Sequence, residues 1–473
     1  MGKTGLMAVL VYLATGVADA HAIGFMQYEH NASATGMADC RTAVADDVSA
    51  VFYNPAALTE LDGLQLQLGT TGILPFVSYQ PADEPRDRSY LSHDNREVMV
   101  NDGENDAETK VRGYTPVHLF ASWAIPDTGV TVAYGLFSPF GLGIFWPGDW
   151  DGRFITTETD LATFFNQANV AVDVARLLGF KKHFKLSVAA GYDFVYATAL
   201  LARRIDLRAT EVFYPDIDDP WGEMKMEGNA TGHGWNLALY AEIPKLLAFG
   251  ASLRSGVRLD FSGTARFWFN PAGQVVRDNL LDFPEGDKTN GKVTIDLPWN
   301  MNFGLAFLGV EDLIIALDLW IAFFESYDEL DLRFSCLDDE DPCSDLAADP
   351  MKTNWGTGWQ LSLGVEYRLT EAWAVRAGYG TVFSPVPDET YDPSLPDGRR
   401  DMYCLGGGWR GDWLKVDLGY MLVLWDDDKD NDVGGYDNPE GDTLFDKGNP
   451  NGKANGRYST LVHLLALTLS ARF

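Results

Sequence analysis

The side chains of this 473-residue chain that could bind a metal or do chemistry are an acidic run near the C-terminus, four cysteines and seven histidines. Asp428, Asp430 and Asp432 have the spacing of the first ligands in a calcium-binding EF-hand loop, whose sixth residue is glycine and whose twelfth is glutamate. Here those positions are Val433 and Pro439. We therefore expect a solvated charged loop, with loose divalent-cation binding as the alternative, and we predict no metal site and no cofactor.

Catalytic motifs are the next possibility. The chain has no G-x-S-x-G elbow, no P-loop and no HExxH motif, and its histidines are scattered. An enzyme is therefore not expected. The alternative is a membrane-embedded hydrolase in which His118 or His233 activates a serine.

The N-terminus has the pattern of a secretory signal peptide. Lys3 precedes a largely apolar stretch, Leu6–Val17, and the small residues of Ala-Asp-Ala-His-Ala follow it. The apolar stretch is too short for a membrane-spanning helix, which needs about 20 residues. We expect cleavage after Ala22, with Ala20 as the alternative, so that residues 1–22 form the signal peptide.

The cysteines can be interpreted once export is assumed. Cys336 and Cys343 bracket an acidic loop that has no histidine nearby, so a local disulfide is predicted in preference to a metal site. Cys40 and Cys404 are not expected to pair with each other, although the sequence leaves such a link open.

Composition excludes several classes of protein. The chain has 36 Lys and Arg against 68 Asp and Glu, which gives a net charge of −32. This charge excludes electrostatic binding to the phosphate backbone of nucleic acid. Aromatic residues make up 13% of the chain, too many for a disordered protein. No later stretch approaches the roughly 18 consecutive apolar residues of a membrane helix. Any insertion into a membrane must therefore use β-strands.

Apolar and polar residues alternate with a period of two along most of the chain. From Lys292 to Phe307 the odd positions are apolar and the even ones mostly polar, and the same alternation recurs in residues 185–196 and 461–473. Fourteen such segments begin near Gly63, Val111, Val130, Asp160, Phe184, Gly228, Ala248, Lys292, Leu313, Thr353, Trp373, Arg400, Leu414 and Arg457.

The connections between these segments alternate between short and long, and most of the excess acidic residues fall in the long ones. Outer-membrane barrels have this layout, with short periplasmic turns, long extracellular loops, an apolar outer band and a polar lumen. The predicted fold is all-β, a fourteen-stranded antiparallel transmembrane β-barrel over residues 63–473 in the bacterial outer membrane. A soluble β-sandwich or propeller is the alternative. The short connections are residues 126–129, 178–183, 244–247, 309–312, 369–372 and 411–413.

Residues 23–62 break the alternation. They are rich in Ala, Gly, Ser and Asp, which is wrong for a lipid-exposed strand but suits short helices and turns. We predict a small N-terminal hatch that fills part of the barrel lumen.

Several motifs follow one another in the order of a known family. The chain resembles the FadL/TodX family of outer-membrane transporters of hydrophobic compounds, and the resemblance runs through the whole mature chain to the terminal Phe473. The matching residues are Gly24-Phe25, Gly36, Ala45-Asp46-Asp47, Asn54-Pro55-Ala56, Ser138-Pro139-Phe140-Gly141, Trp150-Asp151-Gly152-Arg153, Val195-Tyr196-Ala197, Ser384-Pro385-Val386, Leu395-Pro396-Asp397 and Arg400.

This resemblance implies a plugged barrel that takes up a hydrophobic ligand by diffusion through a gated hatch. A kink in the third strand then lets the ligand leave sideways into the membrane. Long-chain fatty acids are the favoured ligand, neutral aromatic hydrocarbons the alternative, and a surface adhesin or structural barrel a more distant one. The implied hatch and gate residues are Gly24, Phe25, Asp46, Asp47, Asn54, Pro55 and Ala56, and the kink residues are Pro139, Phe140, Gly141 and Gly143.

The residues themselves supply a reason for the kink. Pro139 removes a donor from the strand ladder, and Gly141 and Gly143 weaken the strand. The alternative is that the third strand simply ends there.

Recognition of a fatty acid carboxylate requires a cation. Arg203 has the lumen-facing parity of its predicted strand and is our candidate, with pairing to a neighbouring lumen carboxylate as the equal alternative. Family members can carry basic residues just before the motif found here at Leu363–Tyr367, but this chain has Gly356 and Gln360, which keeps a neutral ligand open. The other expected partners are outer-membrane lipid, lipopolysaccharide and the barrel-assembly machinery.

Overall fold

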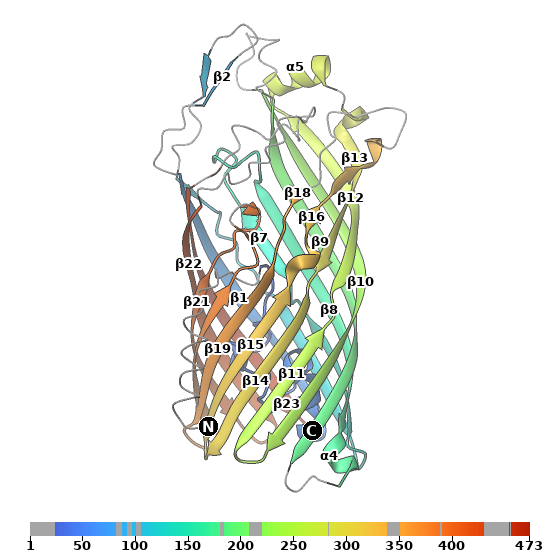
Figure 1. Ribbon diagram of the computed structural model, residues 1–473, viewed down its shortest axis with the longest axis vertical. Coiled ribbons are helices and arrows are strands. Elements are labelled where there is room, and N and C mark those ends of the chain that lie inside the picture. The colour runs from blue at the N-terminus through green and yellow to red at the C-terminus, as the bar shows by residue number, and fades with distance from the viewer. Residues whose placement is uncertain are drawn as a thin grey trace, which may run out of the picture.

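The first long strand of the computed structural model, β1 (Leu64–Pro81), pairs with the last strand, β23 (Gly456–Arg472). On its other side β1 pairs with β5 (Val117–Ile125). Because the first and last strands are hydrogen-bonded in antiparallel register, the sheet closes on itself and has no free edge. The predicted fourteen-stranded antiparallel barrel is confirmed (Figure 1).

The structure describes most of the chain. The predicted signal peptide, Cys343, Asp430 and Asp432 lie outside the described residues. The described residues are 24–81, 88–91, 97–100, 106–179, 184–207, 220–281, 283–337, 351–387, 390–429, 454 and 456–473.

Three of the fourteen strands consist of two pieces: the third is β6 (Val130–Phe137) and β7 (Gly141–Phe145), the seventh β11 (Leu247–Arg254) and β12 (Val257–Phe269), and the eighth β13 (Lys288–Leu297) and β14 (Trp299–Val310). The other long strands are β8 (Glu158–Asp173), β9 (Lys185–Asp206), β10 (Trp221–Ile243), β15 (Leu313–Phe323), β19 (Thr357–Arg368), β20 (Trp373–Phe383), β21 (Arg400–Arg410) and β22 (Leu414–Lys429). Short elements of the long connections are β2 (Arg88–Leu91), β3 (Glu97–Val100), β4 (Ala107–Glu108), β16 (Glu329–Leu330), β17 (Leu332–Phe334), β18 (Met351–Lys352), α5 (Pro271–Leu280), η3 (Glu285–Asp287), η4 (Phe324–Ser326) and η5 (Ser335–Leu337), while α4 (Val174–Leu177) lies in a short turn.

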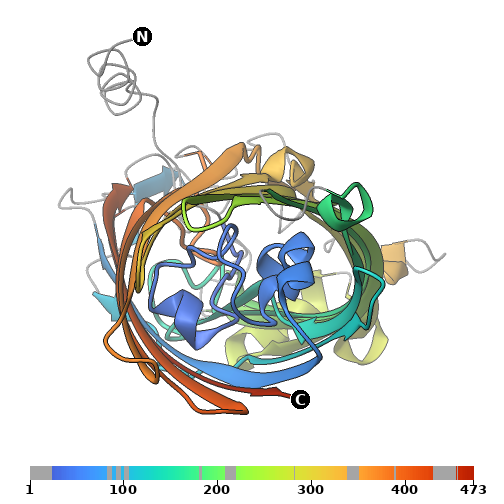
Figure 2. The same cartoon turned by 90° about the horizontal axis from the view of Figure 1, so that it is seen from below.

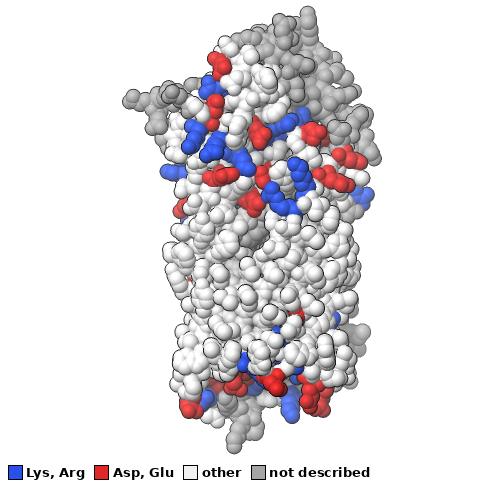
Figure 3. Space-filling model, turned by 180° about the vertical axis from the view of Figure 1, so that it is seen from behind, with Lys and Arg blue, Asp and Glu red and all other residues white. Residues whose placement is uncertain are grey.

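The outer surface carries a continuous apolar band. Side chains such as Leu68, Leu305 and Leu465 point outward from their strands and are 53%, 44% and 64% exposed. Figure 3 shows this band as a nearly uncharged zone, with Lys, Arg, Asp and Glu concentrated above and below it. Such a band has the character of a surface that faces lipid, and the charged zones mark its two edges. Within the described part of the chain, no helix is long and apolar enough to span a membrane.

The eighth strand differs from the prediction that one face of residues 292–307 is apolar throughout. Leu297 in β13 points inward and is 2% exposed, whereas Trp299 in β14 points outward and is 42% exposed. Pro298 lies between the two pieces and cannot donate a ladder hydrogen bond, so the strand is interrupted there. An interruption that shifts the alternation by one residue exchanges the inward and outward faces.

The second strand also begins later than predicted. The alternation suggested a start near Val111, but β5 begins at Val117. Pro116 has no N–H for a ladder, and Gly113 weakens strand structure. Residues 109–116 therefore run beside β1 without completing the sheet on their other side.

The N-terminal segment lies inside the ring of strands, as Figure 2 shows by its blue colour. It contains α2 (Ala32–Thr35), α3 (Ala50–Tyr53) and η1 (Pro55–Glu60), all of them short. The Asn31 side chain caps α2 by accepting a hydrogen bond from the Ser33 N–H at 2.8 Å. Small residues allow this segment to approach the wall closely. A Cβ at Gly250 would lie only 1.9 Å from the Thr42 carbonyl oxygen.

Candidate transport site

A cavity of about 410 Å³ lies between the start of the hatch and the interrupted third strand. It reaches from the lumen to the barrel wall, and most of its lining side chains are apolar, which suits a hydrophobic ligand. The lining residues come from the hatch (Met26, Gln27, Tyr28, Glu29), the third strand (Ser138, Phe140–Ile144), β1 and the segment beside it (Ile73, Pro75, Val77, Tyr114–Val117), β8 (Asp160–Ala162, Phe164) and the lumen wall (Gln360, Val382, Pro396, Arg400, Met402, Val423, Thr460, Val462, Leu464).

The third strand leaves the sheet at the residues predicted to form a kink. Three residues, Ser138–Phe140, separate β6 from β7, whereas two residues separate their partners on β8. The extra residue makes a bulge. Thr163 holds it, because its hydroxyl donates to the Phe140 carbonyl oxygen at 2.7 Å and accepts from the Phe140 N–H at 3.2 Å.

The start of the hatch is hydrogen-bonded to this bulge. The Gln27 N–H donates to the Pro139 carbonyl oxygen at 2.8 Å, and the Gly141 N–H donates to the Phe25 carbonyl oxygen at 3.2 Å. Between these bonds, Met26 and Phe140 form an isolated antiparallel bridge. The hatch thus occupies ladder positions that the third strand has vacated.

Aromatic rings pack around the same contact. The Phe25 ring lies 5.8 Å from the Phe140 ring and 5.5 Å from the Phe324 ring, both in edge-to-face geometry. Phe25 therefore contacts both the bulge and the long connection above the lumen. A displacement of Phe25 would disturb both.

Gly24 is held by two charged side chains. Its N–H donates to Asp397 Oδ2 at 2.9 Å, and its carbonyl oxygen accepts from Arg400 Nη2 at 3.0 Å. Arg400 and Asp397 are themselves 3.5 Å apart. Only glycine suits this position, because its φ is +54° and a Cβ would lie 2.9 Å from the Phe324 and Trp355 rings. Burial raises the pKa of the Asp397 carboxyl, and the nearby Arg400 guanidinium opposes that shift.

The Asn54-Pro55-Ala56 motif joins the hatch to the wall. Asn54 Oδ1 accepts from the Ala56 N–H at 3.2 Å, which caps η1, and Pro55 occupies the first turn of η1. Asn54 Nδ2 donates to the Thr42 carbonyl oxygen at 2.8 Å and to the Leu239 carbonyl oxygen on β10 at 3.1 Å. The motif is thus a buried anchor on one side of the hatch.

Asp46 and Asp47 anchor the opposite side. Asp47 is 2.9 Å from Arg41 of the hatch and 3.2 Å from Lys415 on β22. Asp46 also pairs with Arg41, and it lies 3.8 Å from Lys415. The Asn31 side chain donates to Asp47 at 2.9 Å. Because these groups are buried, separation of the hatch from the wall would leave uncompensated charges, which opposes that movement.

The structure places Arg203 outside the cavity lining. It faces Met224 in the register of β9 and β10 and lies close enough to the buried Asp392 to oppose the rise that burial causes in the pKa of that carboxyl. This favours the alternative weighed for Arg203, which was pairing with a carboxylate. Cys336 is disulfide-bonded, its predicted partner lies outside the described residues, and Cys40 and Cys404 are free and buried.

Sequence reasoning missed three residues of the cavity. Arg400 was predicted only as a member of a family motif and not as a cavity residue. No sequence pattern pointed to Glu29 or Tyr114. The signal for Arg400 was its position three residues after Asp397, on the first residue of an alternating segment. Glu29 and Tyr114 gave no comparable signal, because their place depends on contacts between distant parts of the chain.

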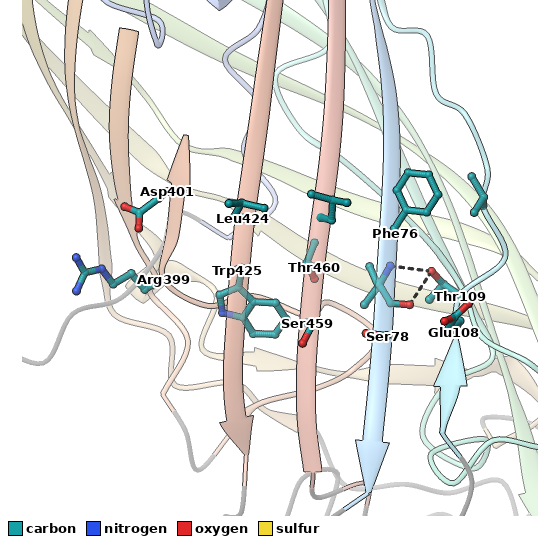
Figure 4. Close-up of a pocket in the computed structure, with 13 residues that line it drawn as sticks. Phe76, Ser78, Glu108, Thr109, Arg399, Asp401, Leu424, Trp425, Ser459 and Thr460 are labelled. Carbon is teal, nitrogen blue, oxygen red and sulfur yellow. Dashed lines mark hydrogen bonds between the residues drawn. The ribbon is translucent and has the colours of Figure 1, made fainter. Parts of the chain in front are cut away.

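A second hollow, of about 830 Å³, lies where β22, β23, β1 and β4 meet (Figure 4). Leu424 and Phe76 lie on either side of it, and the smaller Ser459 and Thr460 lie between them. Its rim is charged, since Arg399, Asp401 and Glu108 also line it. With hydroxyls and mixed charges, this hollow is less suited to a hydrophobic ligand than the cavity beside the third strand.

The plugged barrel with an apolar cavity that reaches its wall defines a class of protein, the outer-membrane transporters of hydrophobic substrates. The family described as "Outer membrane protein transport protein (OMPP1/FadL/TodX)" matches residues 12–473, and the chain belongs to this family. It is a family of transport channels rather than of enzymes. The predicted outer-membrane location is confirmed.

Curated relatives are similar over most of their length. A long-chain fatty acid transport protein of Salmonella typhi is 23% identical over 437 residues, which cover 86% of this chain and 87% of the relative. A protein with the same description from Escherichia coli O6:H1 is 24% identical over 440 residues, covering 86% of each.

Solved structures share the fold. A FadL homologue of Pseudomonas aeruginosa superposes with a TM-score of 0.75 at 18% identity and covers 95% of this chain and 100% of its own. The toluene transporter TodX of P. putida superposes with a TM-score of 0.65 at 15% identity and covers 94% and 99%. At these identities the superpositions show the fold alone.

Proposed function

We propose that this protein takes up long-chain fatty acids, that Arg400 receives the ligand carboxylate, and that the ligand leaves through the wall at the interrupted third strand. The observation that carries this proposal is the position of Arg400. It lines the apolar cavity and at the same time holds the carbonyl oxygen of Gly24 at the start of the hatch. A ligand that engages Arg400 therefore competes directly with the hatch.

The apolar part of the cavity supplies the binding energy. Burial contributes about 0.8 kcal/mol per methylene. The cavity volume of about 410 Å³ falls within the range of roughly 300–1,000 Å³ that is typical of ligand pockets. An alkyl chain would lie along Ile73, Leu142 and Leu161, with its far end toward the wall.

Release of the hatch follows from the same contacts. The Gly24 N–H and carbonyl oxygen bind Asp397 and Arg400, and the next residues bind Pro139 and Gly141. If a carboxylate draws Arg400 away, Gly24 loses one of its two partners. The backbone hydrogen bonds of Phe25 and Gln27 to the bulge then attach the start of the hatch to the wall. When these bonds break, the path from the lumen to the wall opens.

Neutral aromatic hydrocarbons are the second candidate, and one observation favours them. Asp397, which is not part of the lining, already lies 3.5 Å from Arg400, and the acidic residues among the described lining are Glu29 and Asp160. A cavity with two carboxylates and one paired guanidinium has no excess positive charge for an anion. A neutral ligand would use only the apolar walls.

Binding of oleate and toluene to Arg400→Gln separates the two candidates. A hydrogen bond to a charged group contributes about 1.5–3 kcal/mol, so oleate affinity should fall by roughly 10- to 150-fold while toluene affinity changes less than about twofold. Arg203→Gln is the matched control, since Arg203 lies beside Asp392. Equal effects of Arg400→Gln on both ligands would contradict the assignment and favour a neutral ligand.

Outer-membrane lipid, lipopolysaccharide and the barrel-assembly machinery remain proposed partners. The apolar band between two charged zones supports contact with lipid (Figure 3). The terminal Phe473 supports recognition during assembly. It is 70% exposed, and its backbone is bonded to Leu64 in both directions, so it lies at the seam where the barrel closes.

A further inference from the structure

Residues 109–116, which we call the wall strap, occupy the place of the upper half of the second strand. The strap is bonded to β1: the Thr109 N–H donates to the Val77 carbonyl oxygen at 2.9 Å, and Ile73 and Tyr114 exchange backbone hydrogen bonds of 2.8 and 3.0 Å. The Thr109 hydroxyl adds contacts to Val77, which Figure 4 shows as dashed lines. One edge of the strap is thus attached along its length.

The other edge of the strap is attached at one end only. Toward β7, the backbone hydrogen bond in the described part of the chain is that from the Lys110 N–H to the Phe145 carbonyl oxygen, at 2.9 Å. β7 itself is paired with β8. Below Phe145 the wall therefore lacks a continuous ladder between the strap and residues 141–144, and this interval is where the cavity reaches the wall.

The Tyr114 side chain fills that interval. A Cβ built on Gly143 would lie 2.0 Å from the Tyr114 hydroxyl oxygen and 2.2 Å from the adjacent ring carbon. The ring thus lies directly against the bare backbone of Gly143. Tyr114 and Gly143 both line the cavity. Val111, which does not line the cavity, is 55% exposed, and Val117, which also borders the cavity, is 61% exposed. Tyr114 therefore separates the cavity from the outer surface.

Side-chain contacts between charged groups hold the strap across β7. Arg112 Nη1 lies 3.3 Å from Glu158 Oε1 and 3.4 Å from Asp160 Oδ2, both on β8. The Lys110 ammonium lies 4.2 Å from the centre of the Phe145 ring. The Arg112 side chain is 47% exposed, so its ion pairs are weak and are screened by salt. An attachment of this kind opens more readily than a strand ladder.

We propose that the wall strap is the shutter of the sideways exit, that Tyr114 against Gly143 closes it, and that the Arg112 ion pairs set how often it opens. The proposal rests on the sideways release proposed above. It assigns roles to two residues. Tyr114 limits the width of the opening and so determines which ligands pass, and Arg112 sets how often the exit opens.

A disulfide that fixes the strap to β7 tests the proposal. Lys110→Cys with Phe145→Cys places two cysteines where the backbones already hydrogen-bond, in a chain whose free cysteines, Cys40 and Cys404, are buried. In cells that lack their own transporter, the oxidised double variant should take up oleate at least fivefold more slowly than the reduced one. Both forms should bind oleate equally in detergent. Equal uptake by both forms would overturn the proposal.

Single substitutions keep the test decisive if the double variant fails to fold. In lipid nanodiscs, release of bound parinaric acid should be about two- to fivefold faster in Arg112→Gln than in the unmodified protein at low salt, and the difference should vanish at high salt. Arg258→Gln, which removes an exposed ion pair with Asp260 on β12, is the matched control and should leave release unchanged. Equal rates for Arg112→Gln and the unmodified protein at low salt would contradict the assigned role.

Tyr114→Ala and Gly143→Ala should both speed the release of ligand, although one removes side-chain atoms and the other adds them. The first removes the ring that closes the exit, and the second places a methyl group where the Tyr114 ring lies. Both should speed release of a branched fatty acid more than that of parinaric acid, whereas Tyr114→Phe, which keeps the ring beside Gly143, should change release less than Tyr114→Ala does. Slower release in both variants would overturn the proposal. If the unmodified protein takes up neither oleate nor toluene, the proposed function fails instead.

Discussion

The Gln27 N–H donates to the Pro139 carbonyl oxygen at 2.8 Å, so the hatch is bonded directly to the third strand at the point where that strand leaves the sheet. One segment thus plugs the lumen and also pairs with the weakest part of the wall. Movement of the first residues of the hatch would therefore change the lumen and the wall together.

The bulge of the third strand is predicted to be stabilised by Thr163. Thr163→Val keeps the shape of the side chain but removes the hydroxyl that bonds to both backbone groups of Phe140. The Phe140 carbonyl oxygen keeps its bond from the Thr163 backbone N–H, but the buried Phe140 N–H is left unpaired, so the free energy of unfolding should fall by about 1–3 kcal/mol. Urea unfolding in lipid vesicles measures this, with Thr198→Val on β9 as the control. An unchanged transition would contradict the role given to Thr163.

The Asn54 amide is predicted to keep the hatch in place. Asn54→Asp retains the oxygen that caps η1 but removes the donor to Thr42 and Leu239. The hatch should loosen, and cells that produce the variant should become sensitive to a large antibiotic that the outer membrane normally excludes. Asn54→Ala should have at least as large an effect. Unchanged sensitivity in both variants would show that other contacts fix the hatch.

Asp47 is predicted to contribute more to stability than Asp46. Both carboxylates pair with Arg41 and Lys415, but Asp47 is 3% exposed, lies closer to Lys415 and also accepts hydrogen bonds from Asn31 and Ser49, whereas Asp46 is 13% exposed. Removal of one partner of a buried ion pair costs about 3–5 kcal/mol, so Asp47→Asn should lower the melting temperature clearly more than Asp46→Asn. The two variants are matched in chemistry. Equal melting temperatures would rule out this ranking.

Oleate binding is predicted to depend on pH through Asp397. Burial raises the pKa of its carboxyl, so its neutral form favours the folded protein at low pH, and this contribution is lost as the pH rises through the raised pKa. On acidification Asp397 becomes neutral earlier than an ordinary aspartate and frees Arg400. Over the pH range in which oleate itself stays ionised, its affinity should therefore rise as the pH falls toward the raised pKa of Asp397. Asp397→Asn should bind oleate at pH 7 as tightly as the acidified protein does.

Toluene is the control for this pH effect, because it does not titrate. Its affinity should stay constant over the same pH range in both proteins. A parallel change for toluene would show that the pH acts on the barrel as a whole and not on the pair of Asp397 and Arg400.

The barrel could be predicted from sequence because its signals are local. Alternation along residues 185–196 and short turns such as 126–129 and 369–372 depend only on neighbouring residues, and these agree with the structure. The turn predicted at residues 178–183 begins earlier, because β8 ends at Asp173 and α4 follows it. The exchange of faces at Pro298 was missed because a shift of one residue leaves a similar pattern of apolar residues on each side. Arg203 was chosen because its parity predicts a side chain that points into the lumen. Parity does not predict which carboxylate such a side chain contacts.

The contacts of the cavity could not be predicted for a different reason. Gly24 and Asp397 are 373 residues apart in the chain and meet only because the hatch folds back into the lumen. Tyr114 lies against Gly143 because Pro116 ends the strand ladder, and the sequence pattern indicated a strand there. Motifs shared with the family did indicate Gly24, Asp397 and Arg400 as residues of interest, but not their contacts.

The central claim is that ligand passes between the start of the hatch and the third strand. Met26→Cys with Phe140→Cys fixes the hatch to the bulge, because these two residues already form an antiparallel bridge. The decisive measurement is oleate uptake by cells that carry this double variant, before and after reduction. Our account predicts that uptake is lost in the oxidised form and restored by reduction. Equal uptake in both forms would contradict it.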